Sequence, residues 1–306
     1  MTPRDDGDQP LEAAEFPKDL RAPQHPGHSD YDQYFRIART DSGLLSWTRT
    51  CLQVQGAVLD DLADTGLDEA DRIRLVAGLA LLNRSALVAW TSPAGTPPPT
   101  AERAPSTEPD SEAQPSAALH RWRIGHQLFH LQLGVMISTL DTAMDAAQDG
   151  RHRPLIAAMD ELALLYDAAT ATMSYTAGFA PEAYSREVRP TMEPPFLPEG
   201  FSGALNREHS TMTAQLHTLF QTLNQLPDPP EDDTDLAAAT ARLHEARRRN
   251  QANHVAICRR FVPDGVSLLQ AHLDEQEKQA RTSADQPGCG PSPAPHTESR
   301  QEPPPP

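Results

Sequence analysis

The amino-acid sequence predicts an all-α fold, a single helical bundle with proline-rich ends. Apolar residues recur at intervals of three and four over about six long segments. No segment alternates apolar and polar side chains as a half-buried strand does. The 30 prolines among the 306 residues are unevenly spread, so the folded part is shorter than the chain.

Composition divides the chain into one helical domain and three proline-rich segments. Residues 1–29 have few apolar side chains and are predicted to be a disordered lead. Residues 30–280 form the predicted helical domain, interrupted at 92–117 by a proline-rich insertion. Residues 281–306 end in four consecutive prolines and are predicted to be a disordered tail.

The first half of the domain contains three predicted helices. The first runs from Asp30 to Ala63, with a break near Ser42 and Gly43. The second begins at Asp68 and carries apolar residues around most of its circumference, which predicts a central, buried helix. The third follows the insertion and runs from Ala118 to about Gln148.

The second half contains three more. One spans Leu155 to about Ala177, and one follows a proline-rich loop and ends near Leu226. The last begins at Asp235 with Val255 and Cys258 facing inward, is interrupted at Pro263 and continues from Val266 to about Gln279.

The third helix carries three histidines. His126 and His130 are four residues apart and share the apolar face, while His120 lies to one side. Inward histidines can form a hydrogen-bonded polar layer, bind a metal or act on a bound cofactor. The H-x-x-x-H pattern lacks the glutamate of a metalloprotease, and no E-x-x-H pair supports a di-iron bundle.

The loop before the fifth helix is unusually rich in proline. Four apolar side chains are expected to anchor it and favour an ordered structure: Met192, Phe196, Leu197 and Phe201. Its prolines keep residues 189–203 from forming a helix or a central strand. The next helix has one apolar stripe, and His209 falls in the middle of it. A core histidine held by a hydrogen bond is the simplest interpretation, and an axial ligand of a heme iron is the functional one.

These motifs resemble the histidine-ligated heme-dependent aromatic oxygenases. The resemblance lies in Arg189-Pro190-x-Met192-x-Pro194-Pro195, then Gly200-Phe201-Ser202-Gly203 with a histidine six residues on. That superfamily includes tryptophan dioxygenase and the bacterial tyrosine hydroxylases of natural-product pathways, and the pattern is most similar to the hydroxylases. His126-Gln127 looks like the dioxygenase distal pair, although the spacing from His120 is shorter than that pattern.

The resemblance implies a heme b enzyme that oxygenates an aromatic amino acid, with hydrogen peroxide or dioxygen as oxidant. His209 would be the proximal iron ligand, with His126, or His120 or His130, on the distal side. A distal histidine would move a proton between the peroxide oxygens.

The resemblance also implies further residues around the heme and the substrate. Cations near the loop would bind the heme propionates or the substrate carboxylate, or would pair with Glu187 and Glu208. The expected cofactor-binding residues are Arg189 and Arg207, and the expected substrate-binding residues are Arg186, Tyr184 and Ser202.

Charge and cysteine content limit the class of protein. A net charge of −17 argues against binding nucleic acid or an anionic membrane surface. Three cysteines without a paired pattern, no signal peptide and no run of roughly 18 apolar residues predict a soluble cytoplasmic protein. Self-association is left open.

Two other function classes are compatible with the sequence. The first is a non-catalytic, partner-binding helical protein, which would explain the proline-rich segments and the acidic surface. The second is a helical-bundle enzyme with a non-heme metal, which the scarcity of inward Asp and Glu disfavours.

Overall fold

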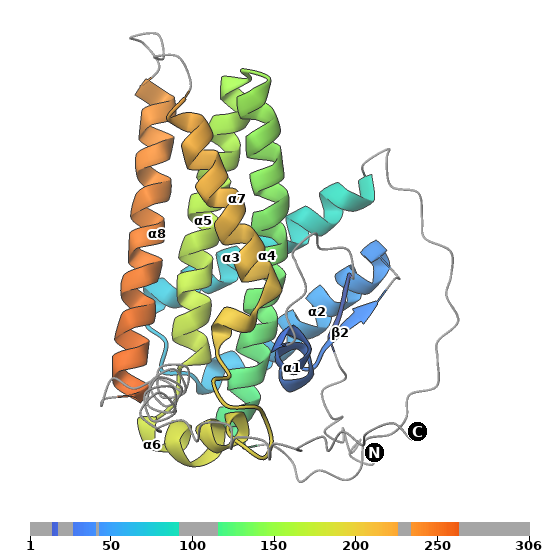
Figure 1. The fold of residues 1–306 in the computed structure, drawn as a ribbon, viewed down its shortest axis with the longest axis vertical. Coiled ribbons are helices and arrows are strands. Elements are labelled where there is room, and N and C mark those ends of the chain that lie inside the picture. The colour runs from blue at the N-terminus through green and yellow to red at the C-terminus, as the bar shows by residue number, and fades with distance from the viewer. Residues whose placement is uncertain (1–13, 18–26, 41–42, 92–115, 226–233, 263–306) are drawn as a thin grey trace, which may run out of the picture.

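The structure is a computed structural model that describes residues 14–17, 27–40, 43–91, 116–225 and 234–262. Within these residues the predicted all-α bundle is confirmed (Figure 1). Much of the predicted lead, most of the insertion, the continuation after Pro263 and the predicted tail lie outside the described residues.

Two long helices form the centre of the bundle. Helices α4 (Ala117–Gln148) and α5 (His152–Thr176) lie side by side over most of their length. Helix α7 (Arg207–Leu223) packs on α4, α8 (Thr234–Phe261) packs on α5, and α3 (Glu69–Thr91) crosses α5. The predicted helices in these regions are confirmed to within a few residues at their ends.

Close contact between α4 and α5 depends on glycine. A Cβ atom on Gly125 would come within 2.8 Å of Thr176 Cβ and 3.0 Å of Thr176 Cα on α5. At the crossing of α3 and α5, a Cβ on Gly78 would come within 2.6 Å of Ala168 Cβ. These glycines let the backbones approach more closely than any other residue would allow.

The N-terminal part differs from the prediction of one broken helix. The short helix α1 (Gly27–Tyr34) is followed by a turn at Arg36, whose φ is 55°. A strand β2 (Ile37–Thr40) follows and pairs in parallel with β1 (Ala14–Pro17), so the expectation of no strand is wrong for these two short segments. Helix α2 (Gly43–Asp61) then begins at the predicted break.

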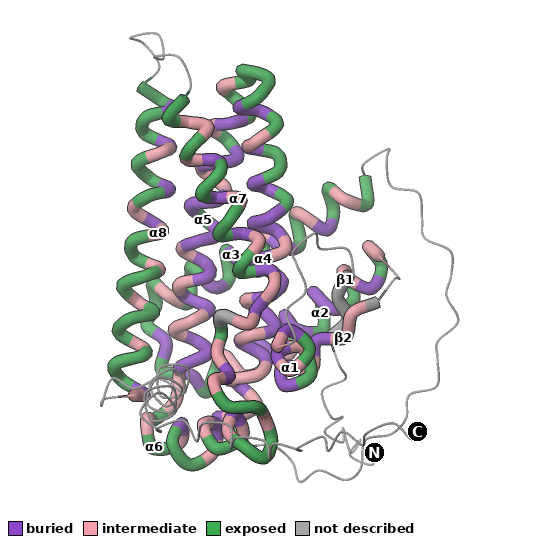
Figure 2. Tube along the Cα trace, viewed as in Figure 1, coloured by how far each residue is buried: buried purple, intermediate pink, exposed green. Residues whose placement is uncertain are grey.

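Helix α3 is not the buried central helix that its composition predicts. Its core-facing side is buried, whereas its other sides are largely exposed (Figure 2). On those sides Ile73, Leu87 and Val88 are 64%, 65% and 61% exposed. By length and hydropathy alone this helix could cross a membrane. Its inner side packs on α5 within the bundle. Packing in the core therefore accounts for the apolar residues on that side without a membrane.

A hydrogen-bonded ion pair fixes α2 to the centre of the bundle. The buried Arg121 guanidinium donates to both carboxylate oxygens of Asp61, at 2.6 and 2.9 Å. The Tyr175 hydroxyl donates to the same carboxylate at 2.8 Å. Residues of α2, α4 and α5 are thereby tied together near the end of α2.

The proline-rich loop between α5 and α7 is ordered, as predicted. Met192 and Phe201 are buried anchors, but Phe196 is 73% exposed, so its predicted anchoring role is wrong. The loop folds into short turns that include α6 (Pro181–Ala183) and the π-helical turn Tyr184–Val188. The remaining single turns are 3-10 helices: Leu62–Asp64, Arg189–Met192 and Gly203–Leu205.

Candidate functional site between α7 and α8

A cleft lies between α7 and α8. The two helices touch where Phe220 stacks on His244 with ring centroids 4.3 Å apart, and α7 then leaves α8 and crosses toward α4 (Figure 1). The cleft contains a cavity of about 160 Å³. It is lined by side chains of four helices: Phe129, Leu133, Met136, Tyr166, Ala169, His209, Met212, Thr213, Leu216, Arg247, Asn250 and Gln251.

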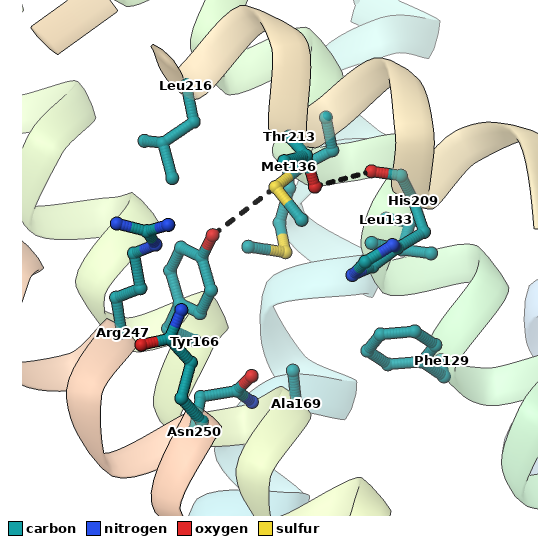
Figure 3. Close-up of a pocket in the computed structure, with 12 residues that line it drawn as sticks. Phe129, Leu133, Met136, Tyr166, Ala169, His209, Thr213, Leu216, Arg247 and Asn250 are labelled. Atoms are coloured by element: carbon teal, nitrogen blue, oxygen red, sulfur yellow. Dashed lines mark hydrogen bonds between the residues drawn. The ribbon is translucent and has the colours of Figure 1, made fainter. Parts of the chain in front are cut away.

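His209 stands in this cleft, in the first turn of α7. The Asn206 side chain caps the helix by accepting a hydrogen bond from the His209 backbone N–H at 2.8 Å. The His209 ring lies 6.3 Å from the Phe129 ring, centroid to centroid, on the wall of the cavity (Figure 3). The prediction that His209 points into the apolar core is therefore wrong, because its side chain is exposed at the mouth of an open pocket.

The surroundings of His209 favour a neutral imidazole. Protein atoms around the ring remove water, and this desolvation lowers the pKa of His209. The nearby His254 lowers it further by charge repulsion. A neutral ring keeps a nitrogen lone pair, which is the form that binds a metal.

The remaining walls of the cavity are apolar on the α4 side and polar on the α8 side. Phe129, Leu133 and Met136 form the α4 wall, while Arg247 and Asn250 come from α8 (Figure 3). The Arg247 guanidinium is the cation among the lining residues. An apolar pocket with one imidazole and one cation can accept a flat apolar ligand that carries a carboxylate.

The sequence interpretation missed His254 on α8. His254 lies close enough to His209 to act on its pKa, and Cys258 lies one turn further, with Sγ 3.6 Å from His254 Nε2. Val255 and Cys258 are exposed, so their predicted inward orientation is wrong. The four-residue spacing of a histidine and a cysteine was the signal that could have revealed this pair.

His126 lies in a different part of the molecule from the cavity. Its ring stacks on Phe35 at 4.1 Å, and Nδ1 lies 2.7 Å from the Trp122 carbonyl oxygen. Burial lowers the pKa of His126 to about 4, so the ring is neutral at pH 7. A hydrogen-bonded polar layer was one of the three interpretations of these histidines, and this hydrogen bond and ring contact are compatible with it.

His130 belongs to a buried ionic network that also contains Glu208. Its Nδ1 lies 3.2 Å from Glu208 Oε2, and burial lowers the pKa of His130 to about 4. Glu208 accepts from Arg39, which also donates to both oxygens of Asp32 at 2.8 and 2.9 Å. Burial opposes the charge of Glu208, but His130 and Arg39 hold its pKa below the ordinary value.

The other predicted site residues do not line the cavity. Tyr184 is buried and stacks on Phe261 with centroids 4.6 Å apart, and Arg189 donates to Glu193 at 2.9 Å. The rest lie on α4, in the loop or at the start of α7: His120, Arg186, Ser202 and Arg207. Their roles, like those of His126 and His130, stay predictions.

Comparison with known proteins identifies the family of this chain. A family model described as SfmD 3-methyl-L-tyrosine peroxygenase matches residues 4–246. The chain belongs to this family. A 3-methyl-L-tyrosine peroxygenase from Streptomyces lavendulae is 26% identical over 249 residues. The alignment covers 79% of the chain and 64% of that relative.

A solved structure supports the fold of this SfmD-family chain. It is the crystal structure of reduced SfmD, obtained by soaking with sodium hydrosulfite, and the two folds superpose with a TM-score of 0.51. The sequences are 21% identical, and the match covers 79% of this chain and 78% of that one. At this identity the likeness establishes a shared helical architecture and carries no residue roles.

Proposed function

We propose that this chain is a heme-dependent peroxygenase that hydroxylates a tyrosine derivative in natural-product biosynthesis. The observation that carries the proposal is the exposed but partly desolvated His209, which stands in an apolar cleft of a chain that belongs to the SfmD family. Hydrogen peroxide is the proposed oxidant, in keeping with the family description, and the proposed substrate is an aromatic amino acid.

The side chains of the cleft are of the kinds that bind a heme. The cavity is large enough for only part of a heme. A neutral imidazole, an apolar wall and the Arg247 cation match an iron, a macrocycle and a propionate. The cavity of about 160 Å³ is smaller than the roughly 300–1,000 Å³ of most ligand pockets. A macrocycle would therefore extend along the exposed side of α8, where His254 and Cys258 lie.

Five side chains in or near the cleft then have a proposed task. His209 and His254, from α7 and α8, would hold the iron. Arg247 would bind a propionate or the substrate carboxylate, and Phe129 and Leu216 would exclude water. A bound heme would supply the oxidising chemistry that transfers oxygen to an aromatic ring.

Replacing His209 tests the assignment of the iron ligand. We expect purified wild-type protein to show a Soret band, and His209→Ala to lose heme by roughly 10-fold or more at equal protein concentration, since an iron ligand is removed. His217→Ala is the matched control, because His217 is an exposed histidine on the same helix. Retention of heme with an unchanged spectrum in His209→Ala would overturn the proposal.

Heme b is the proposed form of the cofactor, and extraction tests it. Acid–acetone removes a non-covalent heme from the chain. The Cys258 thiol, 3.6 Å from His254, is placed where a covalent bond to a heme could form. Colour that stays with wild-type protein and is extracted from Cys258→Ser would exclude heme b and assign the bond to Cys258.

The non-heme alternative has little support in the described part of the chain. Within those residues, no group of three or more His, Cys, Asp or Glu side chains is arranged to hold a metal ion. Colourless purified protein that contains stoichiometric iron or zinc would favour that alternative over heme.

A further inference from the structure

Among the described residues, most of the exposed large apolar side chains lie on α2 and α3, away from the cleft between α7 and α8. Eight of the eleven large apolar side chains that are most exposed belong to these two helices. We call the outer surface formed by six of them the α2–α3 face: Leu45, Leu52, Leu59, Ile73, Val76 and Leu87. They are between 48% and 65% exposed.

Printed contacts fix how α2 and α3 lie against each other. The Gln55 and Asn83 side-chain amides exchange hydrogen bonds of 2.9 and 3.2 Å. The Trp90 indole N–H donates to Thr48 Oγ1 at 2.9 Å. Because seven residues separate the two contacts along each helix and their order is reversed, α2 and α3 form an antiparallel pair.

The exposed apolar residues lie on the same side of this pair. Leu52 and Leu59 are three residues before and four residues after Gln55, so they flank the contact line of α2 on one side. Leu87 lies four residues after Asn83 and has the same relation to the contact line of α3.

The opposite side of the helix pair is the core. Val54 and Val58 of α2 and Leu79 and Leu82 of α3 are buried there. The exposed apolar residues of both helices lie on the side opposite the core, so they share the outer surface of the pair. The face is therefore one continuous surface.

The spacing within the stripes suits another pair of helices. Leu45, Leu52 and Leu59 follow one another at intervals of seven residues, as do Ile73 and Leu87 with an alanine at position 80 between them. Apolar side chains at seven-residue intervals are typical of helices that pack side by side at a shallow angle.

We propose that the α2–α3 face is the interface of a homodimer in which α2 and α3 pack on the same helices of a second copy. Side chains that are about half exposed supply several hundred Å² of apolar surface, on the order of the ~800 Å² that each partner of a stable interface buries. Twofold pairing gives each stripe an apolar partner and produces a four-helix layer. The net charge of −17 disfavours an anionic membrane as the occupant.

Sedimentation or light scattering of the full chain tests this proposal, independently of heme content. We expect a wild-type mass of twice the 33.4 kDa chain at about 10 μM. We expect Leu52→Glu/Leu87→Glu to be monomeric, because each interface would have to bury unpaired carboxylates. The dissociation constant should rise by roughly 100-fold or more.

A matched control and a folding check keep the test decisive. Leu164→Glu changes a 56% exposed leucine of α5 outside the face and should remain a dimer. Unchanged circular dichroism and a cooperative thermal transition would show that the double variant folds, as expected for exposed positions. A wild-type monomer, including one that binds neutral lipid vesicles, or a double variant that stays dimeric would overturn the proposal.

Discussion

At the scale of single residues, Glu208 and His209 divide the first turn of α7 between two environments. Glu208 is buried with His130 and Arg39, whereas its neighbour His209 stands in the cleft on the other side of the helix. A carboxylate in the first turn is also favoured by the helix dipole. The buried network thus fixes the start of α7, and with it the position of His209.

The burial of His126 predicts how stability depends on pH. Its pKa of about 4 in the folded chain lies below the ordinary 6.5, so between these values the unfolded chain binds a proton that the folded chain does not. Stability contributed by the neutral ring is present above pH 6.5 and is lost as the pH falls toward 4. The loss is on the order of 3–4 kcal/mol at most, since one pKa unit corresponds to about 1.36 kcal/mol.

Replacing His126 with glutamine should remove this contribution. Chemical denaturation between pH 4 and 7 should give a free energy of unfolding that varies less with pH in His126→Gln than in wild type. The network around His130 remains, so some dependence should persist. The exposed His217→Gln should follow the wild-type curve, and an equally steep curve in His126→Gln would contradict the prediction.

At the scale of elements, periodicity predicted the helices well and their surroundings less well. The apolar stripe of α7 predicted which side packs, and Met212, Leu216 and Leu219 are buried there. For α3, apolar residues all around predicted a central position, but burial depends on which neighbours cover each side. A sequence pattern does not distinguish the core from a surface that a second molecule could cover.

The α4–α5 contact predicts opposite effects for two glycines on one helix. Gly125→Ala should destabilise the protein by about 1–3 kcal/mol, because the new methyl group would meet the backbone of Thr176. Gly134→Ala on the same helix should stabilise it by about 0.5–1 kcal/mol, since its Cβ would meet only Trp47 Nε1, at 4.0 Å. Urea midpoints of the two variants measure both, and equal shifts would show that the close contact is absent in solution.

At the scale of the whole molecule, the resemblance in the central loop predicted the family, and the cleft lies elsewhere. The loop packs on α1, where Tyr34 Oη lies 2.7 Å from Thr191 Oγ1 and its ring contacts Phe201. The cleft forms where α7 diverges from α8. The sequence of neither helix contains a local pattern that predicts this divergence. His254 lies near His209 on a separate helix, α8, and only the fold brings these two histidines together.

The cleft joins helices that otherwise share few contacts, so filling it should stabilise the whole bundle. Helix α7 packs mainly on α4 and α8 mainly on α5, and a heme held by His209 and His254 would link these two pairs. A ligand at 100 times its dissociation constant adds about 2.7 kcal/mol of stability. For a domain of this size that corresponds to a rise in Tm of roughly 5–10 °C.

Adding hemin to heme-stripped protein while monitoring thermal unfolding measures this effect. The rise in Tm should occur in wild type and in His217→Ala and be largely absent in His209→Ala, because the iron ligand is lost. The Leu52→Glu/Leu87→Glu variant shows whether hemin instead adsorbs to the α2–α3 face: binding in the cleft leaves the rise intact, whereas adsorption would abolish it. A full rise in Tm in His209→Ala would mean that hemin stabilises the bundle without bonding to His209. That result would contradict the proposed link between the two helix pairs.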